Sequence, residues 1–191
     1  MSQVDEILDF WFGRPDEADY GKQRSFWFIK KPEFDQEVRT RFSNHYQQAV
    51  AGSLDHWNNS PRSSLALILL LDQFPRNMFR GTAQAFAADP QALATAQYAV
   101  ANSFDQELFM VQRWFIYLPF EHSENIEHQR QSVKLFATLS DDPDNAATLD
   151  YAIRHYWVIH RFGRFPHRNK ILGRATTPEE AEFLKQPGSS F

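Results

Sequence analysis

The 191-residue chain contains no cysteine, which excludes a disulfide framework and a thiol nucleophile. Its longest apolar run, Leu65–Leu71, has seven residues, whereas a membrane-spanning helix needs about 20. An excess of basic residues is also absent, because 20 Lys and Arg face 24 Asp and Glu, and nucleic-acid-binding domains are usually basic. The first residues lack the positive region of a signal peptide. We therefore expect a cytoplasmic protein with neither a nucleic-acid nor a membrane partner.

Aromatic residues are abundant by contrast. The chain has 18 Phe and 5 Trp, and 42% of its residues are apolar. This composition supports a sizeable core, and the length is typical of one domain. We therefore predict a single domain over residues 1–191.

Helix-start signals recur along the chain. Ser2 and Thr177 each begin a capping-box pattern, with Asp5 and Glu180 three residues later. Ser60, Asp89 and Thr177 each precede a proline, which combines an N-cap residue with the proline that is favoured in the first helical turn. Apolar residues recur at helical spacing, and no stretch alternates as a strand does. The sequence predicts an all-α fold of about seven to nine helices.

Further helix boundaries are also predicted. The apolar helix that contains Leu65–Leu71 should end near Phe74, because this residue precedes a proline and is biased away from helical backbone. Asp105 should cap a helix, and Pro119 should open another that runs to about Leu139.

This last predicted helix carries the most informative polar pattern. Glu121, Asn125 and His128 fall within about 40° of the same line along the helix as Leu135 and Leu139. If the leucines face the core, the polar side chains face inward too. A buried carboxylate must be paired, protonated or bound to a metal.

Three interpretations of these carboxylates remain open. They bind a divalent metal, or a carboxylate or a histidine acts as general base on a substrate that the arginines hold. Alternatively, they lock helix ends together by pairing with Arg76, Arg80, Arg164 or Arg168. Carboxylates favour Mg²⁺ or Mn²⁺, whereas imidazole favours zinc or iron. The candidate metal ligands are Glu121, Glu124 and His128.

A basic segment, residues 161–174, follows the next predicted helix and contains four arginines, a lysine and a histidine. These cations can complement the negative end of a helix dipole, or Arg164 and Arg168 can hold a phosphate or carboxylate bidentately. His167 would then serve in acid–base chemistry. The predicted catalytic residues are His167, Glu121, His155 and Asp72, and the predicted ligand-binding residues are Arg76, Arg80, Arg164, Arg168 and Asn169.

Several motifs occur in order along nearly the whole chain: Leu-Asp-Phe-Trp-Phe-Gly at 8–13, Leu-Leu-Asp-Gln-Phe-Pro-Arg-Asn at 70–77, Leu-Pro-Phe-Glu-His-Ser-Glu at 118–124, and the block 161–169 with the Leu-Gly-Arg that follows. Together they resemble the mainly bacterial family called domain of unknown function 924. The resemblance implies an all-helical fold similar to tetratricopeptide-like stacked helix pairs, and it implies no established activity. A period of about 34 residues is not visible, so the similarity concerns helix stacking only.

The sequence leads to two functional hypotheses. In the first, a polar pocket between three predicted helices binds a small anionic metabolite and, if the protein is an enzyme, hydrolyses it by acid–base or metal-assisted chemistry. In the second, the charged cluster is purely structural and the protein is a helical interaction module. That module would bind a peptide or protein in an exposed aromatic groove formed by Trp27, Trp57 and Trp114. The sequence leaves the oligomeric state open.

Overall fold

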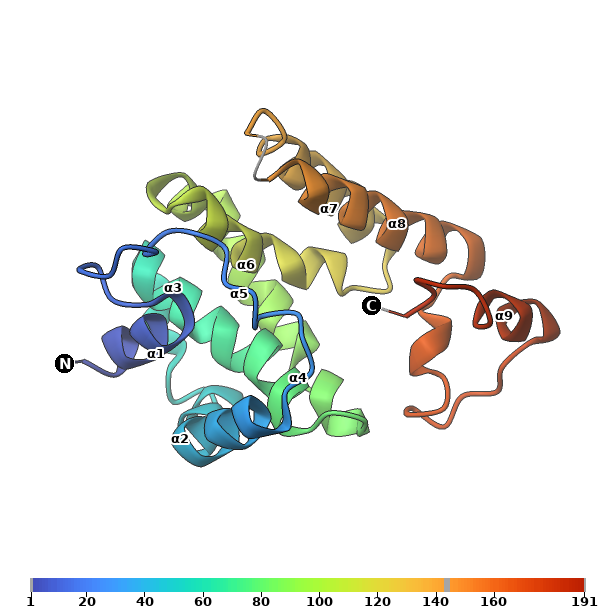
Figure 1. Ribbon diagram of the computed structural model, residues 1–191, viewed down its shortest axis with the longest axis horizontal. Helices are drawn as coiled ribbons and strands as arrows, with labels where there is room; N and C mark the ends of the chain where they lie inside the picture. Colours follow the sequence, from blue (N-terminus) through green and yellow to red (C-terminus); the bar gives the residue numbers. More distant parts are fainter. Residues whose placement is uncertain (1, 143–144, 191) are drawn as a thin grey trace. The chain divides into compact units, whose positions relative to one another are not determined.

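A computed structural model describes residues 2–142 and 145–190. Within these residues there are nine α-helices and no strand, so the all-α prediction is confirmed (Figure 1). None of these helices is both long and apolar enough to cross a membrane. The helices are α1 (Gln3–Phe12), α2 (Pro32–Val50), α3 (Pro61–Ile68), α4 (Phe74–Met78), α5 (Asp89–Ala101), α6 (Met110–Glu121), α7 (Ile126–Ala137), α8 (Ala146–Phe162) and α9 (Pro178–Phe183).

The chain divides into two compact units. The first contains Met1–Arg80 and Gln84–Pro119, and the second contains Gly81–Ala83 and Phe120–Phe191. Helices α1 to α5 and most of α6 therefore belong to the first unit, and α7 to α9 belong to the second. The assignment of the whole chain to a single domain stays a prediction.

Capping signals define the starts of α1, α3 and α9 as predicted. Ser2 begins α1 with a capping box that it forms with Asp5. Ser60 accepts a hydrogen bond from the backbone of Ser63 at the start of α3, and Thr177 forms a second capping box with Glu180 at the start of α9. These caps satisfy backbone N–H groups that have no partner inside the helix. The N-cap predicted at Asp89 is wrong, because Asp89 is the first residue of α5 and follows Ala88, which has no side-chain oxygen to accept a hydrogen bond.

The apolar helix does not end near Phe74, and this prediction is wrong. After α3 the backbone widens into a π-helical turn, Leu69–Gln73, and continues directly into α4 with Phe74 in helical conformation. Pro75 cannot donate the backbone hydrogen bond that an α-helix needs at this position. The wider π-helical turn accommodates the proline, so that the helix continues from α3 into α4.

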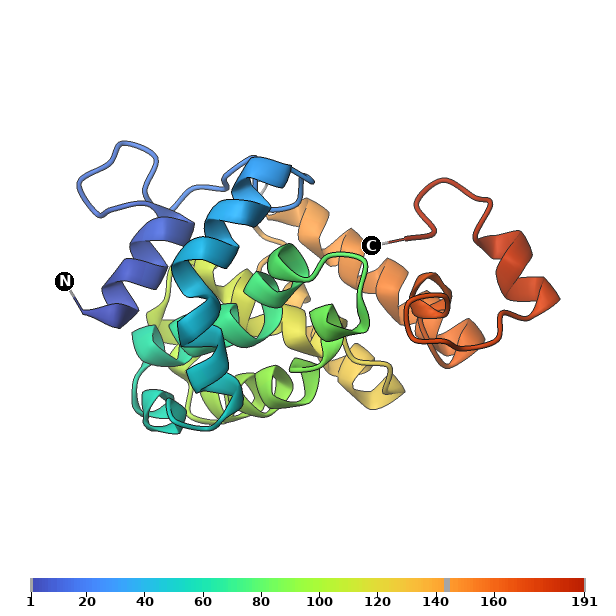
Figure 2. The same ribbon diagram turned by 90° about the horizontal axis from the view of Figure 1, so that it is seen from below.

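The first unit is built around this long helix. Helix α2 packs alongside α4 and the π-helical turn, and α5 packs against α3 (Figure 2). Aromatic rings fill the space between the elements. The ring of Trp11 lies 5.5 Å from that of Phe74 and meets Phe115 edge-on at 5.6 Å.

The predicted aromatic groove is wrong. Trp27, Trp57 and Trp114 are exposed by only 5%, 6% and 3%. Trp27 donates its indole N–H to the carbonyl of Trp11 at 2.9 Å, which satisfies its polar atom inside the core. These tryptophans stabilise the fold and do not form a docking surface.

Asp105 does not cap a helix. It lies in a short 3-10 turn before α6, it is 2% exposed, and its carboxylate accepts hydrogen bonds from the Tyr117 hydroxyl and the Gln106 side chain, both at 2.6 Å. Asp105 therefore anchors the turn to α6, because a buried carboxylate needs strong donors.

In the second unit, α7 and α8 lie side by side (Figure 1). The single helix predicted from Pro119 to Leu139 is wrong. Pro119 lies inside α6, which ends at Glu121, and α7 begins at Ile126 with Asn125 as its N-cap. Two helices therefore replace one, and the common stripe predicted for Glu121 and His128 does not exist.

Replacement of Tyr117 by Phe should destabilise the protein by about 1–3 kcal/mol, because it removes a donor from the buried carboxylate of Asp105. Equilibrium urea unfolding would measure the loss. Tyr98→Phe is the matched control, since Tyr98 is 49% exposed and should lose almost nothing. Equal losses in both variants would contradict the anchoring role of Asp105.

Candidate functional site

The candidate site lies in the second unit, in the segment that follows α8. Gly163 ends α8 in the left-handed region with φ of 68°, which glycine adopts without steric cost. A 3-10 turn over Pro166–Arg168 and a loop then lead to α9. This path places the cations of the basic segment beside carboxylates of the same unit.

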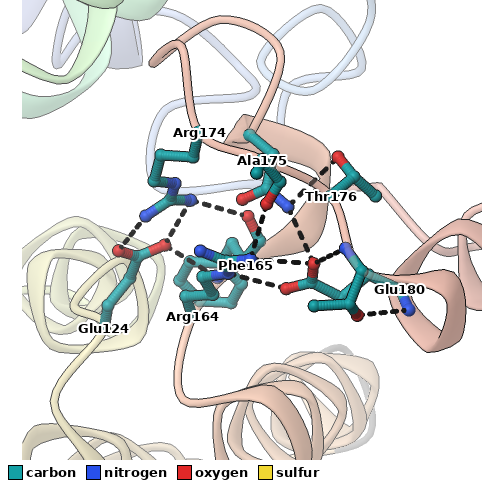
Figure 3. A network of polar contacts seen from close by, with 9 residues as sticks. Glu124, Arg164, Phe165, Arg174, Ala175, Thr176 and Glu180 are labelled. Atoms are coloured by element: carbon teal, nitrogen blue, oxygen red, sulfur yellow. Dashed lines mark hydrogen bonds and ion pairs between the residues drawn. The ribbon is translucent and has the colours of Figure 1, made fainter.

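Arg164 forms a bidentate ion pair with Glu180 (Figure 3). Its Nε and Nη2 atoms lie 2.6 and 2.9 Å from the two carboxylate oxygens. Asn169 and the backbone N–H of Thr177 also donate to Glu180, at 3.2 and 2.8 Å. The guanidinium predicted to hold a ligand therefore holds a carboxylate of the chain itself.

Glu180 is 2% exposed, and its pKa is lowered to about 2. The hydrogen bond from Arg164 is the main cause, burial opposes it, and the donors of Thr177 add to it. The carboxylate is therefore ionised at every pH at which the protein is expected to function.

Glu124 and Arg174 form a second ion pair of this kind. We call the two ion pairs, Arg164 with Glu180 and Glu124 with Arg174, the clamps. The two carboxylate oxygens of Glu124 accept hydrogen bonds from Arg174 at 2.7 and 3.0 Å, and one of them also accepts from the backbone N–H of Phe165 at 2.7 Å (Figure 3). Burial disfavours the charged carboxylate, but these donors outweigh it and lower the pKa of Glu124. Arg174 also donates to the carbonyl of Phe165 at 3.0 Å.

The fully buried ring of Phe165 is the centre of a group of ionisable side chains. The guanidinium of Arg168 lies over this ring, 4.6 Å from its centroid. The imidazole of His155 meets it edge-on at 5.5 Å, and that of His167 lies 5.6 Å away. We call His155, Phe165, His167 and Arg168 the Phe165 cluster.

Glu121 joins this cluster through His155. The Nδ1 atom of His155 lies 3.1 Å from a carboxylate oxygen of Glu121 and 2.9 Å from the carbonyl oxygen of Tyr151. The carbonyl oxygen can only accept a hydrogen bond, so Nδ1 must carry the proton. In the neutral ring Nε2 is then the basic nitrogen.

Both histidines of the cluster are neutral at pH 7. Burial lowers the pKa of His155 to about 3, although the hydrogen bond to the carbonyl of Tyr151 acts in the opposite direction. Burial and the nearby charge of Arg168 lower the pKa of His167 to about 4. The positive charge of the cluster is therefore carried by the guanidinium of Arg168.

The predicted metal site is not formed. Within residues 2–142 and 145–190, no group of three or more His, Cys, Asp or Glu side chains is placed to hold a metal ion. The break between α6 and α7 separates the ligands, so Glu121 contacts His155, Glu124 binds Arg174, and His128 Nδ1 lies 2.9 Å from the Ser123 hydroxyl.

The remaining predicted site residues belong to the first unit. Asp72 is fully buried in the π-helical turn, 3.4 Å from Arg76, which also binds Asp89 with two hydrogen bonds of 2.9 and 3.2 Å. Arg80 binds Asp35 bidentately at 2.7 and 2.8 Å. Both arginines therefore hold carboxylates of their own unit.

The sequence analysis assigned no individual role in the site to Phe165 or Arg174, and it did not predict that Glu180 pairs with Arg164. Glu180 was recognised only as a capping residue. Glu124 and Arg174 are 50 positions apart, and a single sequence carries no signal for such a pair.

Comparison with known proteins gives a family but no activity. A family model described as bacterial protein of unknown function (DUF924) matches residues 7–188. The chain belongs to this family. It is also similar to the solved structure of a protein of unknown function, ATU0120, from Agrobacterium tumefaciens, with 42% identity, a TM-score of 0.84, and coverage of 96% of this chain and 97% of that chain. No curated protein matches the chain.

Replacement of Glu180 by Gln should destabilise the protein by about 1–3 kcal/mol at neutral pH, because it removes the charge that binds Arg164. The folded-state pKa of about 2 lies below the ordinary value of 4.5. This contribution is therefore complete above about pH 4.5 and is lost as the pH falls toward 2.

Urea unfolding of the wild type and of Glu180→Gln should be measured between neutral pH and about pH 3. The difference between their free energies of unfolding should become smaller as the pH falls. Glu179→Gln is the matched control, since Glu179 lies on the same helix but is 62% exposed. A difference that does not change with pH would contradict the role of the Glu180 charge.

Proposed function

We propose that the protein is a cytoplasmic protein whose Phe165 cluster binds a small anionic metabolite. If the protein is an enzyme, we propose that it hydrolyses this metabolite. The observation that carries this proposal is the buried contact between Glu121 and His155 next to the guanidinium of Arg168. Groups with strongly shifted pKa values that gather in one place are typical of functional sites.

The charge of the cluster supports an anionic ligand. Arg168 is 7% exposed, and a guanidinium in a poorly solvated place interacts more strongly with an anion than one in water does. Its planar donors match phosphate and carboxylate groups. Neutral imidazoles such as His167 can donate one hydrogen bond and accept another, which suits a polar ligand beside the cation.

The pair of Glu121 and His155 supports acid–base chemistry of limited strength. A carboxylate that holds Nδ1–H orients the imidazole and leaves Nε2 as the group that accepts a proton. However, a pKa of about 3 makes His155 a weak base at neutral pH. Binding is therefore the better supported part of the proposal.

A helical interaction module is the second candidate. It is favoured by the arginines that the chain already neutralises, since Arg76, Arg80 and Arg164 all bind carboxylates of their own unit. In this case the clamps serve only to fix helix ends, and stacked helix pairs offer a surface to a peptide or protein.

A thermal-shift screen with inorganic phosphate and with phosphorylated and carboxylated metabolites tests the first candidate. A ligand at about 100 times its Kd stabilises by about 2.7 kcal/mol, which raises the Tm of a chain of this size by about 5–10 °C. His167→Ala should remove the shift and leave the Tm of the free protein close to that of the wild type.

His160→Ala is the matched control, because His160 is exposed on α8 and its loss should preserve the shift. A strongly lowered Tm of ligand-free His167→Ala would indicate a structural histidine. Absence of any shift across the whole screen would favour the interaction module.

A further inference from the structure

The outward face of α8 carries an aromatic and charged stripe that the proposed function does not use. Asp150, Arg154, Trp157 and Arg161 recur at three- and four-residue spacing, so they share one side of the helix. All four are exposed, and Trp157 is 58% exposed. Ile153 beside them is 37% exposed. Tryptophan is highly buried on average and is enriched among the residues that dominate protein interfaces.

The order of charges along this stripe is complementary to itself. The acid, Asp150, lies near the start of α8, and Arg161 lies in its last turn. In an antiparallel pair of α8 helices, the register that sets Asp150 opposite Arg161 also sets Arg154 opposite Trp157, because both pairs have the same midpoint along the helix. Two-fold symmetry makes each contact occur twice.

We propose that this face of α8 is a self-association surface whose partner is a second copy of the chain. Two ion pairs between Asp150 and Arg161 would flank the crossing, and two cation–π contacts between Arg154 and Trp157 would lie at its centre. Antiparallel packing also places each helix dipole against its opposite.

The contacts within one chain can be exchanged at little cost. Asp150 and Arg154 pair at 2.7 Å with side chains that are 57% and 56% exposed, and Arg161 pairs with Glu179 at 2.9 Å with side chains that are 53% and 62% exposed. Such exposed pairs contribute little to stability, because water and salt screen them. Asp150 and Arg161 can therefore leave these partners for each other across the dimer.

The mixed charge of the stripe selects a second copy over a partner of one charge sign. A strongly acidic partner would meet Asp150, and a strongly basic one would meet Arg154 and Arg161, whereas an antiparallel copy matches every position. One pair of helices buries less than the roughly 1,200–2,000 Å² of a stable interface. We therefore expect a weak dimer that forms as the protein concentration rises.

Sedimentation velocity of the full chain over a wide range of concentration tests the proposal. The wild type should shift from monomer toward dimer. Asp150→Arg and Arg161→Asp should each weaken dimerisation by about tenfold or more, because each sets like charges opposite one another twice. Tyr98→Ala, at an exposed aromatic residue of the first unit, should dimerise as the wild type does.

Mixing the two reversed variants gives the decisive result. Each alone carries only repulsive pairs at positions 150 and 161, but a mixed dimer has two attractive pairs, so an equal mixture should dimerise where the separate variants do not. Trp157→Ala should also weaken the dimer. A wild type that stays monomeric at every concentration, or a mixture that fails to associate, would overturn the proposal.

Discussion

The ion pair between Glu124 and Arg174 holds both backbone polar groups of Phe165. Glu124 accepts the N–H of Phe165, Arg174 donates to its carbonyl, and the two side chains bind each other bidentately. This closed set of hydrogen bonds fixes the backbone immediately after α8. The position of the Phe165 ring, and with it the packing of His155 and Arg168 around that ring, depends on this clamp. The cost of burying the charge of Glu124 is offset, because Arg174 and the backbone N–H of Phe165 donate hydrogen bonds to its carboxylate oxygens.

Four side chains of the candidate site therefore have a fixed charge. Glu124 and Glu180 are held ionised by their donors, while His155 and His167 are held neutral by burial. These charges do not change across the ordinary range of pH, because none of these four pKa values is moved into that range. These four side chains therefore do not form a pH-driven switch in that range.

Local signals in the sequence were sufficient for the all-α class and for several helix starts, but not for every helix boundary or for the site. Capping boxes at Ser2 and Thr177 were confirmed because every group involved lies within a few residues. The break after Glu121 was missed, since Pro119 was placed in the first turn of a helix when it lies in the last. That one misplaced boundary produced the false stripe of metal ligands. Pairing of carboxylates with arginines was one of the open interpretations, but the actual partners could not be assigned because they come from distant parts of the chain.

The arginines show why a basic segment in an acidic protein is an ambiguous signal. Arg164 and Arg174 present planar donors to carboxylates that arrive from α9 and from the loop before α7, so their charge serves the fold. Arg168 lies over the ring of Phe165, next to two neutral imidazoles. Residue type alone does not reveal such surroundings, since a guanidinium serves in an ion pair and in contact with a ring alike. The geometry assigns the clamps to stability, and the surroundings of Arg168 are where a functional test is most informative.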